Sequence, residues 1–135
     1  MKSPKLAYVV EDDHITAVIT ELIAKKNLRC RAVQRFSNGQ RAFDQLTAAV
    51  REGASVPDLI LLDLNMPLMD GWEFLDAFSG LALHQQVCVF VLTSSIHPED
   101  IEKATHYEVV KGYFSKPLDD QNIDRMKALL REVDA

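Results

Sequence analysis

The stretch DLILLDLNMPLMDGWEF, residues Asp58–Phe74, joins an apolar run directly to an acid and a turn. Leu59–Leu62 are four consecutive apolar residues, and Asp63 follows them without a polar spacer. A short run that is apolar at every position is typical of a strand buried on both faces of a sheet. Because a carboxylate at the edge of a core is costly without a partner, the stretch predicts an acid with a chemical role.

The rest of the chain alternates short apolar runs with helical patterns. The five predicted strands are Leu6–Val10, Cys30–Phe36, Leu59–Leu62, Val87–Leu92 and Gly112–Phe114. A predicted helix follows each strand: the first ends at about Asn27, the second near Gly53, and the others cover Trp72–Leu81, Pro98–Tyr107 and the stretch after Asp119. This alternation predicts an α/β fold in which helices cover both faces of a parallel sheet.

Local signals predict how the helices begin. Asp13 fits the N-cap of the first helix, and Asp119 fits the N-cap of the last. Ser37 and Gln40 fit a capping box for the second helix, and Pro98 suits the first turn of the fourth. The first helix is predicted to be amphipathic, with apolar residues at helical spacing at Ile15, Val18, Ile19, Leu22 and Ile23.

Composition excludes several classes of protein. The chain has 135 residues, which suits one domain, and its 47% hydrophobic and 26% charged residues are typical of a soluble globular protein. A net charge of −5 argues against direct binding to DNA or to an anionic membrane. The apolar runs are too short to cross a bilayer, and the first residues do not resemble a signal peptide. Two cysteines, Cys30 and Cys88, favour buried free thiols over a disulfide, so we expect a cytoplasmic protein.

Polar side chains follow four of the five predicted strands. If the strands are parallel, their carboxyl ends meet at one edge of the sheet, where ligands of such folds bind. The side chains that this edge would collect are Glu11, Asp12, Asp63, Thr93 and Lys116. No glycine-rich phosphate-binding loop is present in the sequence.

An acidic cluster with a single lysine needs a further cation. Two carboxylates about 4 Å apart repel by about 4 kcal/mol at an effective dielectric constant of 20. Carboxylate oxygens at an open, partly wet site suit Mg²⁺, which also pairs with phosphate. A carboxylate can attack phosphorus to form an aspartyl phosphate, and the charge of the phosphoryl oxygens must then be neutralised. The sequence therefore predicts that Asp63 faces a metal ion and a phosphoryl group.

Four motifs in a fixed order resemble one family. VVEDD, DLILLDLNMPLMDGWEFL, VLTSS and YFSKP make nearly the whole chain similar to the receiver domain of two-component response regulators. The resemblance implies a flavodoxin-like (βα)5 three-layer sandwich with five parallel strands in the order 2-1-3-4-5. Because the chain ends just after the last predicted helix, we expect residues 1–135 to form one stand-alone receiver domain of the chemotaxis type.

The resemblance also implies a role for each residue of the edge. Asp63 corresponds to the phosphoacceptor. Glu11 and Asp12 correspond to the acidic pair that binds Mg²⁺, or Mn²⁺ in its place, with Asp12 a direct ligand and Glu11 acting largely through water. Asn65 corresponds to the residue whose backbone carbonyl completes the metal site.

The remaining implied roles concern the residues that respond to phosphorylation. Thr93 corresponds to the hydroxyl residue that moves toward the phosphoryl group, and Lys116 to the lysine that binds it. Tyr113 corresponds to the aromatic residue whose rotamer follows Thr93. The bond between Lys116 and Pro117 is often cis in the family, and an X-Pro bond can adopt that form.

These roles imply a phosphorylation-dependent signalling switch rather than an enzyme. Its expected partners are a sensor histidine kinase or a histidine phosphotransfer protein and an unknown downstream protein. The expected oligomeric state is a monomer or a weak homodimer.

Two alternatives remain open at this point. A phosphatase of the haloacid dehalogenase type also forms an aspartyl phosphate, but its motif needs a second acid where this chain has Asn65. A receiver-like module could also bind its partner without phosphorylation, although the complete set of site residues argues against this.

Overall fold

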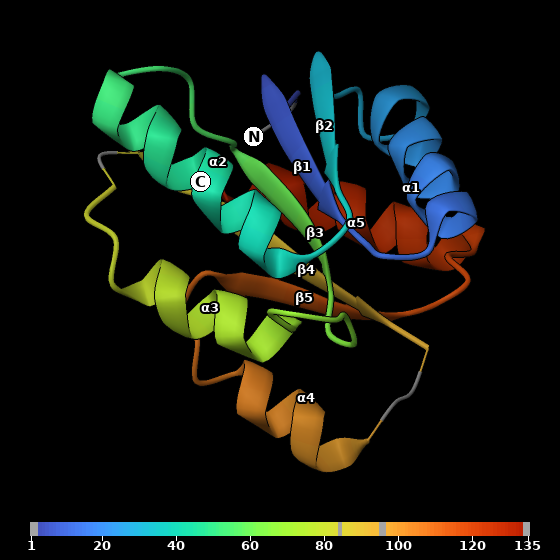
Figure 1. Cartoon of the computed structure of the whole chain (residues 1–135). Helices are drawn as coiled ribbons and strands as arrows, with labels where there is room; N and C mark the ends of the chain where they lie inside the picture. Colours follow the sequence, from blue (N-terminus) through green and yellow to red (C-terminus); the bar gives the residue numbers. More distant parts are fainter. Residues whose placement is uncertain (1–2, 84, 95–96, 134–135) are drawn as a thin grey trace.

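The computed structural model describes residues 3–83, 85–94 and 97–133, so Ser95 of the VLTSS motif lies outside the described residues. Five helices and five strands alternate along this part of the chain (Figure 1): β1 Leu6–Val10, α1 His14–Lys26, β2 Ala32–Phe36, α2 Gly39–Glu52, β3 Leu59–Asp63, α3 Gly71–Ser79, β4 Cys88–Thr93, α4 Pro98–Ala104, β5 Val110–Ser115 and α5 Asp120–Val133. All strand pairs are parallel, in the order β2-β1-β3-β4-β5. The predicted doubly wound, flavodoxin-like fold is confirmed.

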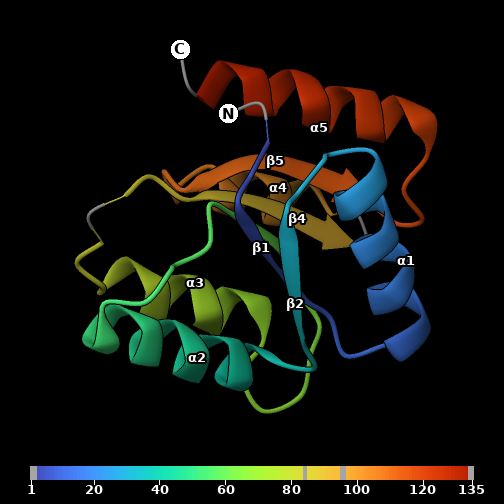
Figure 2. The ribbon, with the colours of Figure 1, turned by 90° about the horizontal axis from the view of Figure 1, so that it is seen from above.

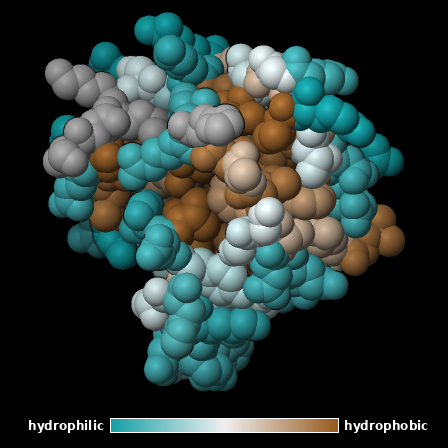
Figure 3. Space-filling model, turned by 90° about the vertical axis from the view of Figure 1, so that its left-hand side faces the viewer, coloured by the Kyte–Doolittle hydropathy of each residue, from teal (hydrophilic) through white to brown (hydrophobic). Residues whose placement is uncertain are grey.

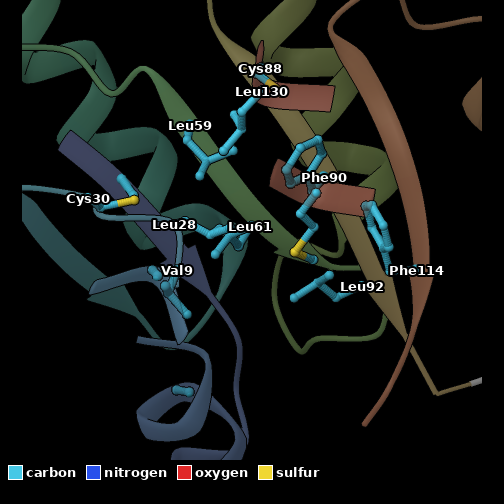
Figure 4. Packing of buried hydrophobic residues seen from close by; sticks show 14 residues of the cluster. Val9, Leu28, Cys30, Leu59, Leu61, Cys88, Phe90, Leu92, Phe114 and Leu130 are labelled. Atoms are coloured by element: carbon cyan, nitrogen blue, oxygen red, sulfur yellow. The ribbon is translucent and has the colours of Figure 1, made fainter. Parts of the chain in front are cut away.

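The sheet separates two hydrophobic layers. Helices α1 and α5 lie on one side of it, and α2 and α3 lie on the other (Figure 2). Side chains of β3 alternate between the layers: Leu59 and Leu61 pack toward α1 and α5, whereas Ile60 and Leu62 pack toward α2 and α3. Figure 4 shows the first layer, where Phe90 of β4 and Leu130 of α5 belong to one cluster. Because both faces are buried, every position of β3 is apolar up to Asp63.

The predicted caps of the first and last helices are confirmed, but the predicted capping box of α2 is wrong. The Asp13 carboxylate accepts from the N–H of Thr16 at 2.9 Å, and the Asp119 carboxylate accepts from the N–H of Asn122 at 2.8 Å. In α2 the N-cap is Asn38 rather than Ser37, since the Asn38 side chain accepts a hydrogen bond from the N–H of Arg41 at 2.9 Å. The helix begins at Gly39, which leaves Ser37 one residue too early to reach a free N–H group.

The buried face of α1 differs from the apolar stripe that the sequence predicts. The buried residues are the small side chains Ala17, Thr20 and Ala24, which let the helix lie close to the sheet. By contrast, the bulky residues Ile15 and Leu22 are 69% and 50% exposed. When a helix has apolar residues on more than one face, helical spacing alone does not show which face packs on the core.

Among the element boundaries, the start of β2 and the end of α4 differ from the prediction for clear physical reasons. Strand β2 begins at Ala32 instead of Cys30, because Arg29 has a φ of 57° and the N–H of Cys30 still donates to the carbonyl of Ala24 at 3.0 Å. At Cys30 the chain therefore still forms part of the turn that follows α1. Helix α4 ends at Ala104 rather than at Tyr107, and α4 is only seven residues long.

Apolar side chains reach the surface on one side of the molecule. Figure 3 shows them between polar margins. A hollow of about 500 Å³ near the end of α3 is lined by both apolar and polar side chains, among them Phe78, Leu81, Leu83 and Val109. In the described part of the chain, no helix has the length and apolar content needed to span a membrane.

Both cysteines are buried free thiols, as the sequence predicts. Burial raises the pKa of the Cys30 and Cys88 thiols to about 12. We therefore expect the folded protein at pH 8 to react with a thiol-specific disulfide reagent at least about a hundredfold more slowly than the urea-unfolded protein. Absorbance of the released thiolate measures both rates. Rapid reaction of either thiol in the folded state would contradict the packing described above.

Candidate functional site

The carboxyl ends of three strands bring one lysine between two buried acids. Glu11 follows β1, Asp63 ends β3 and Lys116 follows β5. The ammonium of Lys116 lies 2.6 Å from Oε1 of Glu11 and 3.3 Å from Oδ1 of Asp63. Glu11 and Asp63 are 6% and 4% exposed, so water screens their charges poorly. Lys116 is 105 positions from Glu11 and 53 positions from Asp63 in the sequence, and the parallel sheet explains why they meet.

A third acid gives this group an excess of negative charge. Glu11, Asp12 and Asp63 each place a carboxylate oxygen within 4.8 Å of the others. Asp12 is exposed, whereas the other two acids are buried. Three carboxylates face one ammonium, and their hard oxygen donors fit a divalent cation such as Mg²⁺ or Mn²⁺. An open hollow of about 850 Å³, lined by Glu11 and Asp12 among others, borders these two acids of the cluster.

Burial dominates the protonation behaviour of the acids. It raises the pKa of Glu11 to about 7, which the hydrogen bond from Lys116 opposes and the nearby charge of Asp63 reinforces. Burial also raises the pKa of Asp63, while the charge of Lys116 and its hydrogen bond lower it. For Lys116, burial lowers the pKa, but the bond to Glu11 and the two negative charges outweigh it and leave the pKa raised. The lysine therefore stays charged, and the acids need a further cation to be ionised together.

The backbone after Asp63 folds back tightly under the site. The N–H of Gly71 donates to the carbonyl of Leu64 at 2.9 Å, and a Cβ atom at Gly71 would lie only 2.7 Å from the carbonyl oxygen of Asp63. Asp70 and Glu73 form a capping box that begins α3 directly after this contact. Gly71 is not among the site residues predicted from the sequence, although its place after a helix-capping acid is a signal for such a close approach.

Asn65 contributes a backbone group next to the phosphoacceptor candidate. Its N–H donates a hydrogen bond to the Asp63 carboxylate, which lowers the pKa of that acid against the effect of burial. The predicted contact between the Asn65 carbonyl and a metal ion stays a prediction.

Thr93 and Tyr113 lie where the sequence places them, and their switching roles stay predictions. Thr93 ends β4, is 1% exposed, and its carbonyl accepts from the N–H of Lys116 at 2.8 Å. Tyr113 lies in β5 opposite Val91, and its hydroxyl is buried without a hydrogen-bond partner among the described residues. The bond between Lys116 and Pro117 is cis, as predicted.

Comparison with known proteins assigns the family. A family model for the response regulator receiver domain matches residues 7–128, and the chain therefore belongs to this family. The chain is 28% identical to the two-component response regulator ORR41 of Oryza sativa subsp. japonica over 123 residues, which cover 91% of each protein.

Solved structures of response regulators share the fold. The chain is similar to the Mn²⁺-bound form of Rcp1, with a TM-score of 0.73 and 26% identity over 91% of this chain and 88% of that one. It is also similar to the phosphorylated cyanobacterial phytochrome response regulator RcpA, with a TM-score of 0.72 and 30% identity over 93% of this chain and 90% of that one. The acidic cluster thus occurs in a fold of which a metal-bound and a phosphorylated member are known.

Proposed function

We propose that this protein is a phosphorylation switch that accepts a phosphoryl group on Asp63 from the phosphohistidine of a partner protein. One observation carries the proposal: three carboxylates with oxygens within 4.8 Å of one another share a single lysine, which lies 3.3 Å from Asp63. A structural ion pair would need one acid for one lysine. The excess of acid instead suits a divalent cation together with a group that carries its own negative charge.

Each residue has a defined part in the transfer. A carboxylate oxygen of Asp63 attacks phosphorus, the phosphorus–nitrogen bond to the donor imidazole breaks, and the imidazole leaves with a proton from solvent. Lys116 donates to a phosphoryl oxygen and offsets its charge. Glu11, Asp12, Asp63 and the Asn65 carbonyl would hold Mg²⁺, which neutralises charge on the phosphoryl oxygens when it is bound.

The new phosphoryl group would then change a partner-binding surface. Thr93 is the hydroxyl residue at the end of β4, and its movement toward the phosphoryl group would change the position of α4, the next helix along the chain. Tyr113, two residues before the end of β5, would follow that movement. Such a switch works by changing the populations of two states, because the phosphoryl group contacts one of them better.

The proposed donors are a sensor histidine kinase or a histidine phosphotransfer protein in the cytoplasm. A phosphohistidine would approach Asp63 from the carboxyl edge of the sheet, because Asp63 is 4% exposed and ends a fully buried strand. Ile15, Ile19 and Leu22 form an exposed apolar stripe that begins in the first turn of α1, next to Asp12. An apolar stripe at this place suits contact with a helix of the donor.

Phosphorylation by a small donor tests the proposal. We expect acetyl phosphate with Mg²⁺ to add one phosphoryl group to the intact protein, and no group to be added when EDTA removes the metal. Intact-mass spectrometry measures the adduct, and a known receiver domain in the same buffer serves as the control. An unmodified protein beside a modified control would exclude the proposal. Continuous hydrolysis of an external phosphate ester would indicate the phosphatase alternative instead.

A further inference from the structure

Helix α4 has little buried surface to hold it on the molecule. Of its seven residues only Ala104 is buried, and its isoleucine, Ile101, is 39% exposed. Most helices of globular proteins are held by the packing of an apolar face. Figure 1 shows α4 at the bottom of the view, below α3. Side-chain contacts with α3 therefore have an unusually large share in keeping α4 in place.

Four side chains join α3 to the end of α4. The indole ring of Trp72, in the first turn of α3, stacks on the ring of Tyr107, with centroids 6.1 Å apart and 28° between the planes. The ammonium of Lys103 lies 4.5 Å from the centroid of the Trp72 ring. The hydroxyl of Tyr107 donates to Oδ1 of Asp76 at 2.6 Å, which raises the pKa of Tyr107 to about 12. We call these four residues the α3–α4 cluster.

The cluster joins an anchored helix to a weakly anchored one. On α3 the side chains of Phe74 and Leu75 are fully buried, which fixes this helix in the core. Tyr107 follows α4, and its N–H donates to the carbonyl of Ala104 at 3.1 Å, so its ring moves with the end of that helix. A shift of α4 away from α3 by about 1 Å or more would break the hydrogen bond to Asp76. The cluster can therefore stay intact only while α4 keeps its present position.

We infer that the α3–α4 cluster holds α4 in its unphosphorylated position, so that phosphorylation of Asp63 has to break the cluster. The inference rests on the proposed function, in which α4 changes position, and adds positioning residues that no chemical step uses. The cluster is complete in a structure in which Lys116 binds the free carboxylate of Asp63. A contact made in one state only lowers the affinity for anything that favours the other state. The cluster thus sets how readily Asp63 accepts a phosphoryl group.

Trp72 reports on the cluster directly, because it is the only tryptophan of the chain. We expect phosphorylation by acetyl phosphate with Mg²⁺ to change its fluorescence emission and to increase quenching by acrylamide, since Tyr107 and Lys103 then no longer cover the indole ring. Asp63→Asn should show neither change under the same conditions. A change that requires Asp63 is a spectroscopic signature that a purely structural contact would not give.

Three variants test the effect of the cluster on phosphorylation. Trp72→Leu removes the ring stack and the cation–π contact, whereas Tyr107→Phe removes only the hydrogen bond to Asp76. Phe43→Leu is the matched control, because Phe43 of α2 makes an edge-to-face contact with Phe74 of α3, with centroids 6.4 Å apart, and lies outside the cluster. Urea unfolding measures the stability of each variant. If Trp72→Leu does not fold, Tyr107→Phe decides alone, since it keeps both rings.

We expect acetyl phosphate to phosphorylate Trp72→Leu about three to ten times faster than the wild type, and Tyr107→Phe about two to five times faster. These factors correspond to the loss of an aromatic contact or a hydrogen bond from one of two states. Phe43→Leu should stay within about twofold of the wild-type rate. Intact-mass spectrometry at successive times measures the rates. A variant that is less stable and yet phosphorylated faster is the signature of a contact that opposes the switch.

Other outcomes would overturn the inference. Unchanged or slower phosphorylation of the cluster variants would show that the cluster does not oppose the switch. Equal acceleration of Phe43→Leu would show that any loosening around α3 has the same effect. A fully phosphorylated wild-type protein with unchanged Trp72 fluorescence would show that the cluster stays intact. Failure of acetyl phosphate to modify even the wild type would instead refute the proposed function, so the two failures can be told apart.

Discussion

Asp63→Asn is expected to accept no phosphoryl group and to unfold less readily than the wild-type protein. The amide keeps an oxygen that can accept from Lys116 and from the N–H of Asn65, but it removes one of three clustered negative charges. In metal-free buffer this should raise the free energy of unfolding by about 1 kcal/mol, since reactive sites commonly hold unfavourable charge for the sake of function. The variant should also lose most of the stabilisation that Mg²⁺ gives the wild-type protein.

Intact-mass spectrometry after incubation with acetyl phosphate and Mg²⁺ tests the first part, and urea unfolding with and without Mg²⁺ tests the second. Asp124→Asn is a matched control, because Asp124 is an exposed acid on α5 that does not belong to the cluster of Glu11, Asp12 and Asp63. The control should accept a phosphoryl group and respond to Mg²⁺ as the wild type does. A phosphoryl adduct that persists in Asp63→Asn would place the phosphoacceptor elsewhere.

The sequence predicts the sheet and the site well because both depend on simple regularities. Strand β3 is apolar at four successive positions since each face of the sheet buries alternate residues, and a run of this length favours a strand over a helix. Once the strands are parallel, their last residues must share an edge. The meeting of Glu11, Asp63 and Lys116 then follows from topology and needs no detail of packing.

The features that the sequence does not predict depend on distances between a few atoms. Asn38 and Ser37 are both good N-caps, and only the position of the first turn decides between them. A Cβ atom at position 71 would lie only 2.7 Å from the Asp63 carbonyl oxygen, and this distance depends on how the loop folds back rather than on residue types alone. Leu68 has a φ of 68°, a left-handed value that contradicts the preference of leucine itself and costs about 1–2 kcal/mol.

Lys116→Met is expected to slow phosphorylation by acetyl phosphate by a factor of about 10²–10³, the usual effect of removing one group that stabilises the charge of a transition state. It should also lower the free energy of unfolding by about 2 kcal/mol in EDTA, because Glu11 and Asp63 then lose their buried ammonium partner. Mg²⁺ should restore much of this loss, since the ion takes over the neutralising role of the lysine.

The dependence of stability on pH provides an independent check in metal-free buffer. The pKa of Glu11 in the folded wild-type protein is raised to about 7, above its ordinary value of 4.5, chiefly by burial. The folded state therefore binds more protons than the unfolded state between these values, and stability falls as pH rises through that window. In Lys116→Met the opposing hydrogen bond is gone, so the fall should be larger and extend to higher pH.

Lys111→Met separates these effects from a general loss of positive charge. Lys111 lies on β5, the strand that Lys116 follows, but its side chain is exposed. The Lys111→Met substitution should therefore change neither the phosphorylation rate nor the response to Mg²⁺. Stopped-flow measurement of phosphorylation and urea unfolding at several pH values would give all the required quantities. If Lys116→Met were phosphorylated at the wild-type rate, the 3.3 Å contact with Asp63 would be only a structural ion pair. The charge balance of the acidic cluster would then have to come from the metal ion alone.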